Sequence, residues 1–173
     1  MDPRIGNLNY IVKSPEQIVI LLLLAAVVYL SAGWTAAGAG DPTDLPILQK
    51  WSGDFPVARL ERLPQGNSKA GAGYIDDKSL FEGVWKVFKP GEPVPEVDFG
   101  TQIVVFYRNV AFYNRTNIVK ITLRDGTAEI IAIETRSALP IEDKVAMAMV
   151  VIPRAGVKFI QAGSKRIPVS PVQ

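Results

Sequence analysis

The chain has 173 residues, a formal net charge of +2, and neither histidine nor cysteine. Without these residue types it lacks the commonest general base, thiolate nucleophiles, disulfides and the usual ligands of zinc and iron–sulfur clusters. Its balanced charge argues against nucleic acid as a partner, because nucleic-acid-binding domains usually carry a basic stripe.

An apolar segment at residues 18–39 contains no charged residue. About 20 apolar residues are enough to cross the hydrocarbon core of a bilayer as a helix, so we predict a transmembrane anchor here. Residues 1–17 then form a short segment before the anchor. The positions expected to hold the helix in lipid are Ile18, Leu22, Leu24, Val27, Leu30 and Trp34.

Two alternatives for this segment stay open. Its most apolar part, residues 18–30, is short for a spanning helix, and residues 37–39 have the small-x-small form that signal peptidase cleaves. A cleaved signal peptide is therefore the main alternative, and a buried core helix is the other.

The charges around the segment predict its orientation. Arg4 and Lys13 precede it, whereas the first basic residue after it is Lys50. Basic residues favour the cytoplasmic flank of a spanning helix. We therefore predict a single-pass protein of the cell membrane with a cytoplasmic N-terminus and a periplasmic or extracellular C-terminal domain.

The chain after the segment has the length of one domain. Residues 40–50, which begin with Gly, Asp, Pro and Thr, are expected to be a linker, and residues 51–173 to form the domain. We predict a short strand over residues 57–63, a loop over 64–73 and an extended piece at 73–75.

One soluble helix is predicted after Asp76 and Asp77, whose carboxylates are expected to support its N-terminus. Ser79 and Glu82 have the spacing of a capping box, and Pro90 follows the helix. Its apolar residues recur at helical spacing, with Trp85 expected in the core rather than at a ligand site. These residues are Leu80, Phe81, Val84, Trp85 and Phe88.

The rest of the chain alternates with period two, as strands do. Asp125 and Gly126 predict a type I′ hairpin turn, because both central positions of that turn need positive φ. The fold class is therefore α+β, with one antiparallel sheet of about five to seven strands and one helix packed on a face. The strands are expected at residues 101–107, 117–124, 127–135, 145–152, 157–161 and 167–169.

Catalytic motifs are missing. The chain has no glycine-rich phosphate loop and no carboxylates at the spacing of a calcium loop. Ser164 and Lys165 are adjacent, so on an extended strand they point to opposite faces and do not form a dyad. We predict no catalytic, cofactor-binding or metal-ligating residue.

Residues 107–117, with the sequence YRNVAFYNRTN, combine aromatic rings and arginines, which are enriched in protein interfaces. We predict a partner-binding surface here. The alternative is a connection between strands whose rings complete the core. The candidate contact residues are Tyr107, Arg108, Phe112, Tyr113 and Arg115.

Three features of the sequence occur together: the helix residues Leu80, Phe81 and Trp85, the segment PEVDF at residues 95–99, and the run MVVIPR at 149–154. With these motifs, residues 74–160 resemble the PrcB family of bacterial protease-complex accessory subunits. The resemblance implies an α+β domain that binds other proteins. The family's glycine-rich turn is replaced here by residues of the 107–117 segment, which puts an inherited partner in doubt.

The PEVDF segment also has a local explanation. Asp98 is expected to hydrogen-bond the turn, so that Val97 and Phe99 anchor the crossover from the helix to the sheet.

The function predicted from the sequence is that of a non-catalytic, membrane-anchored accessory subunit. Its partners would be the lipid bilayer and the protein subunits of a larger membrane-bound or protease complex. The alternative is a small-ligand binder or an enzyme without recognisable motifs that uses carboxylates and the two arginines of the 107–117 segment.

Overall fold

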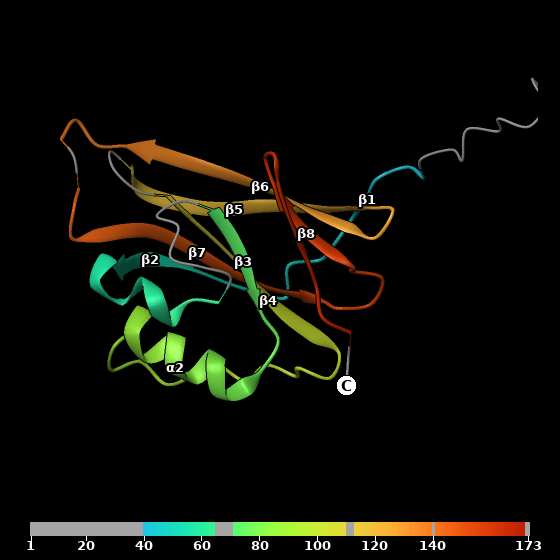
Figure 1. Ribbon diagram of the computed structural model, residues 1–173, viewed down its shortest axis with the longest axis horizontal. Helices are drawn as coiled ribbons and strands as arrows, with labels where there is room; N and C mark the ends of the chain where they lie inside the picture. Colours follow the sequence, from blue (N-terminus) through green and yellow to red (C-terminus); the bar gives the residue numbers. More distant parts are fainter. Residues whose placement is uncertain (1–39, 65–70, 110–112, 140, 172–173) are drawn as a thin grey trace, which may run out of the picture. The chain divides into compact units, whose positions relative to one another are not determined.

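The computed structural model describes residues 40–64, 71–109, 113–139 and 141–171 (Figure 1). In this part, the chain forms strands, one α-helix and one 3-10 helix. They are β1 (Thr43–Asp44), β2 (Gln49–Pro56), the 3-10 helix η1 (Val57–Arg62), β3 (Gly71–Ile75), α2 (Lys78–Phe88), β4 (Gln102–Asn109), β5 (Tyr113–Arg124), β6 (Thr127–Arg136), β7 (Lys144–Pro153), β8 (Phe159–Ala162) and β9 (Lys165–Pro168).

The strands form two sheets, which confirms a mixed α+β fold. The four-stranded sheet has the order β2-β7-β4-β3, and the five-stranded sheet has the order β1-β5-β6-β8-β9. All pairs are antiparallel except β6 and β8, which are parallel. The prediction of a single sheet was therefore wrong.

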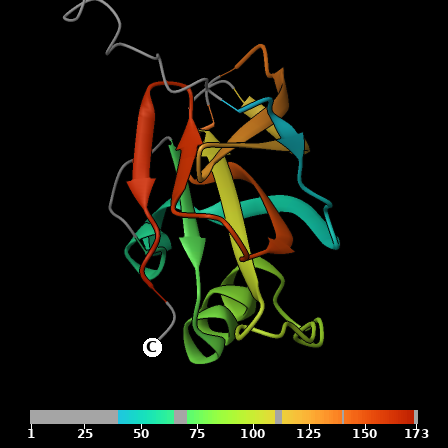
Figure 2. The same cartoon turned by 90° about the vertical axis from the view of Figure 1, so that its right-hand side faces the viewer.

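The second sheet follows from strands that are apolar on both faces. Eight consecutive residues of β7, from Val145 to Ile152, are buried, so this strand needs cover on both sides. A single helix covers only one face of a sheet. Figure 1 shows β4 and β7 between α2 on one side and β5 and β6 on the other, and Figure 2 shows the same order after a turn of 90°.

Two apolar cores result. The helix-side core joins α2 to one face of the four-stranded sheet and includes Phe55, Trp85 and Met147. The inter-sheet core lies between the two sheets and includes Ile118 and Val150. Trp85 is 2% exposed, and its ring lies 5.0 Å from that of Trp51, so the prediction of a core tryptophan is confirmed.

Helix α2 begins differently from the predicted capping box. The side chain of Asp77 accepts a hydrogen bond from the Leu80 backbone N–H at 2.8 Å. The capping box at Ser79 and Glu82 was therefore wrong, because both residues lie inside the helix. The predicted support from Asp77 is confirmed, since an extended residue before the first turn can reach the third amide.

Two assignments near the start of the domain were also wrong. Residues 57–62 form η1 and not a strand, and Val57 and Leu60, which are three residues apart as in one turn of a 3-10 helix, both pack against the helix-side core. The linker predicted over residues 40–50 contains β1 and the start of β2. Between them, Leu45 and Ile47 pack against the inter-sheet core.

The predicted turns are confirmed. Asp125 and Gly126 have φ values of 49° and 77°, as a type I′ turn requires. The carboxylate of Asp98 accepts hydrogen bonds from the Thr101 hydroxyl at 2.7 Å and the Gly100 backbone N–H at 3.0 Å. Val97 and Phe99, on either side of Asp98, pack against the helix-side core.

The strands expected from residue 101 onward correspond to β4–β9. The described residues from Gly40 onward belong to one compact unit. None of the helices that the structure describes is long and apolar enough to cross a membrane. The predicted anchor residues Ile18, Leu22, Leu24, Val27, Leu30 and Trp34 lie outside the described part.

Candidate functional site

The residues of the predicted partner-binding segment lie mainly on two strands. Tyr107 and Arg108 belong to β4, whereas Tyr113 and Arg115 belong to β5. Phe112 lies outside the described residues, and the side chain of Tyr113 is not described. The segment is therefore not a single exposed connection.

Arg108 is buried. Its side chain is 2% exposed, and its guanidinium carbon lies 5.5 Å from the centre of the Phe106 ring. Burial lowers the pKa of Arg108. Tyr107 is half-buried and packs against the inter-sheet core. For these two residues the structure agrees with the alternative of core packing, and Arg115 is the candidate whose described side chain is exposed.

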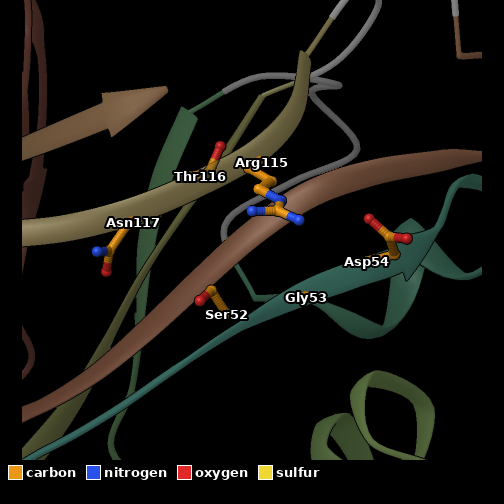
Figure 3. Close-up of a pocket in the computed structure, with 6 residues that line it drawn as sticks. All are labelled: Ser52, Gly53, Asp54, Arg115, Thr116 and Asn117. Carbon is orange, nitrogen blue, oxygen red and sulfur yellow. The ribbon is translucent and has the colours of Figure 1, made fainter. Parts of the chain in front are cut away.

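Arg115 lies beside a hollow with a volume of about 490 Å³ between β5 and β2. Figure 3 shows Arg115 extending from β5 toward β2 and Asp54 pointing from β2 toward β5. Thr116 points the other way. The residues that line the hollow are Ser52, Gly53, Asp54, Arg115, Thr116 and Asn117.

The hollow lies where β5 has no neighbouring strand on one side. β1 pairs only with Leu123 and Thr122, and the Leu45 backbone N–H adds a hydrogen bond to the Ile121 carbonyl. Within the described residues, no strand pairs with this side of β5 from Arg115 to Lys120. We call residues 115–120 the open edge.

The charges at the hollow differ in their partners. Asp54 forms a salt bridge of 2.6 Å with Lys144, and the hydrogen bond to Asp54 raises the pKa of Lys144. Arg115 is exposed and forms no salt bridge within the part of the chain that the structure describes. Its guanidinium can therefore bind an external carboxylate in a bidentate geometry.

Thr116 carries a buried polar group beside the open edge. Its side chain is 2% exposed, and its hydroxyl has no hydrogen-bond partner among the described residues. Its partner across the ladder, Glu134, accepts a hydrogen bond from the Asn109 amide at 2.9 Å instead. Leaving a buried hydroxyl without a partner costs about 1–3 kcal/mol.

The outer face of β5 and β6 carries three exposed β-branched residues, which we call the apolar strip. Val119, Ile131 and Ile133 are 42%, 42% and 61% exposed. Ile131 lies opposite Lys120, beside the bulge at Val119, and Ile133 lies opposite Asn117. Sequence reasoning missed this strip, although the run IIAI in β6 is apolar at both odd and even positions.

The hollow shows no catalytic arrangement. Asp54 is held by Lys144, and no hydrogen bond joins it to Ser52 in the described structure. In the same part of the chain, no three acidic side chains gather where they could hold a metal ion. The described residues of the hollow offer hydrogen-bonding groups, the Asp54 carboxylate that is paired with Lys144, and the guanidinium of Arg115.

No protein-family model, curated protein or solved structure was found to match this chain. The resemblance to the PrcB family therefore stays a prediction.

Proposed function

We propose that this chain is a non-catalytic accessory subunit that is anchored in a membrane and binds another protein through its five-stranded sheet. The observation that carries the proposal is the apolar strip. The solvent face of an antiparallel sheet is usually polar, whereas Val119, Ile131 and Ile133 are apolar, exposed and adjacent. A contiguous apolar patch on a surface marks an interaction site more often than isolated exposed residues do.

The distribution of charge around the strip fits a protein partner. Arg115 and Lys120 flank it on β5, and Glu129 lies beyond it on β6. Protein interfaces commonly have an apolar centre and a polar rim with arginine among its contacts. The resemblance to the PrcB family supports a protease complex, or another membrane-bound complex, as the partner.

The start of the domain supports attachment close to a bilayer. Only residues 40–42 separate the uncharged segment 18–39 from β1. Three extended residues span about 10 Å, so an anchored domain would stay near the lipid headgroups. A membrane-bound complex would then be the natural partner.

The test is co-purification of the full chain from detergent-solubilised membranes. We expect a stoichiometric partner protein with the parent chain and its loss with Ile133→Asp, because a carboxylate in the strip would lose its hydration when the partner covers it. Val94→Asp is the matched control, since Val94 is 37% exposed on the helix side of the domain. It should retain the partner.

Two further results decide the proposal. After a carbonate wash the chain should stay in the membrane pellet with Met1 present, because an uncharged segment of this length resists extraction. A soluble chain whose N-terminus follows the predicted cleavage site would contradict anchoring. Recovery of the same partner with Ile133→Asp, or of no stoichiometric partner with the parent, would contradict binding through the strip.

A further inference from the structure

We infer that the open edge of β5 is a strand-addition site for an extended, acidic segment of the partner protein, an inference that rests on the proposed function and specifies its binding mode. Strand addition supplies affinity through main-chain hydrogen bonds and specificity through alternate side chains. The described structure provides a free edge, uncovered space beside it, and two side chains that need partners.

The free edge is long. β5 spans 12 residues, but β1 pairs with only two of them. An edge strand with unpaired N–H and C=O groups is a template for another strand. The bulge between Ile118 and Lys120 bends this edge, yet residues 115–118 before the bulge keep a regular ladder to β6 on their other side.

The hollow between β5 and β2 lies where one more strand of the five-stranded sheet would be. Ser52 and Asp54 on β2 are exposed, whereas their ladder partners on β7, Ala148 and Ala146, are 1% and 2% exposed. Ladder partners point to the same face, so all four side chains point toward the five-stranded sheet. That sheet packs on β7, and a hollow remains between residues 52–54 of β2 and residues 115–117 of β5. A strand added beside β5 would lie in the hollow and cover Ser52.

The side chains at the edge specify the added segment. Neighbours across a ladder point to the same face, and successive residues alternate between faces. A residue beside Arg115 would lie on the same face of the sheet as the guanidinium, where a carboxylate can pair with it. The next residue would lie on the opposite face beside Thr116, whose buried hydroxyl has no partner among the described residues. A serine or threonine fits there.

The outward side of the segment continues onto the apolar strip. A residue placed beside Val119 would contact an exposed apolar side chain. The predicted ligand therefore alternates inward hydroxyl residues with outward acidic and apolar residues. A second copy of this chain fits poorly at the edge, because β5 has no acidic residue and would bring Arg115 and Lys120 of both copies together.

The test uses the full chain in detergent micelles and two fluorescent eight-residue peptides. The acidic probe has the sequence ETVTETVT, and the basic probe is KTVTKTVT. We expect fluorescence anisotropy to show about tenfold or tighter binding of the acidic probe than of the basic probe, because its carboxylates can pair with Arg115, whereas lysines would be repelled by it. Two further acidic probes are N-methylated at the odd or at the even positions, and one of them should not bind, since its methyl groups replace the N–H hydrogens that face β5.

Three variants assign the site. Arg115→Glu should reverse the preference between the probes. Arg124→Glu is the matched control, because Arg124 is an exposed arginine of β5 beyond the open edge, and it should leave the preference unchanged. Thr116→Val should weaken binding of the acidic probe without lowering the melting temperature.

Hydrogen exchange locates the site directly. Amide exchange should slow at residues 115–120 when the acidic probe binds and stay unchanged in β9, the opposite edge of the sheet.

Several outcomes overturn the inference. They are no binding of the acidic probe, undiminished binding of both N-methylated probes, an unchanged preference in Arg115→Glu, or slowed exchange outside the open edge. Sedimentation that shows a dimer of the parent and a monomer of Arg115→Glu would assign the edge to a second copy. If the partner protein no longer co-purifies with Ile133→Asp but still co-purifies with Arg115→Glu, the proposed function is supported and the strand-addition inference is refuted.

Discussion

Replacing Thr116 with valine should stabilise the domain. The hydroxyl is 2% exposed and has no hydrogen-bond partner among the described residues, so it carries a desolvation cost in the folded state. Valine has nearly the same shape and the same β-branching, so it should fit the site and keep the strand propensity. Replacing a buried polar residue usually lowers the free energy of unfolding, whereas this replacement should raise it.

The magnitude follows from the lost polar group. A buried hydroxyl without a partner costs about 1–3 kcal/mol, and a methyl group in its place adds apolar burial of about 0.8 kcal/mol. From the lower part of this range we expect a net gain of about 1–2 kcal/mol. For a domain of this size, that corresponds to a rise in Tm of about 3–8 °C.

The assay is thermal unfolding of the full chain in detergent, with Thr122→Val as the control. Thr122 lies on the same strand but is partly exposed, so its hydroxyl can bond to water and its replacement should change Tm little. A fall in Tm for Thr116→Val would refute the reasoning. It would mean that the hydroxyl has a partner in the folded protein, and the inward hydrogen bond of the added strand would lose its basis.

Three other predictions test the fold. Trp85→Ala should destabilise the domain by about 3–5 kcal/mol, measured by denaturant unfolding, because it empties the centre of the helix-side core. The hydroxyl of Thr101 and neighbouring backbone N–H groups lower the pKa of Asp98, so this carboxylate stabilises the fold above its unfolded pKa and loses that effect as pH falls through the lower folded pKa. Thr101→Val should raise the pKa of Asp98 in a carboxyl-detected NMR titration, and an unchanged value would contradict the assigned cause. Gly126→Ala should lower Tm, since φ is 77° and a lysine side chain lies 3.0 Å from the added Cβ, whereas Gly83→Ala, in an open position of α2, should raise it.

Local signals in the sequence predicted most elements correctly. The strands from residue 101 onward, the helix and the turn at Asp125 and Gly126 each depend on periodicity or on backbone preferences of a few neighbouring residues. The helix cap was misassigned because Asp77 and Ser79 are both good N-cap residues. Only the extended backbone at Asp77 decides between them.

The two-sheet architecture was harder to predict because it depends on distant segments. The buried run of β7 indicates cover on both faces, but the sequence does not show that β5 and β6 supply it. Arg108 illustrates a conflict between two local signals. Arg108 lies on the same face of β4 as Val104 and Phe106, which are buried in the helix-side core, whereas charged side chains usually lie at the surface. Strand periodicity determined the outcome, and the long side chain packs over a ring.

The open edge is a consequence of how the chain connects its two sheets. β1 begins the five-stranded sheet at Thr43, but by Gln49 the chain already forms β2 in the other sheet. The few residues between them turn inward, where Leu45 and Ile47 contribute to the inter-sheet core. β1 therefore cannot continue along β5 without withdrawing these side chains from the core. The same connection that completes the core leaves residues 115–120 without a neighbouring strand in the described part of the chain, and this is the edge at which we propose that a partner segment adds.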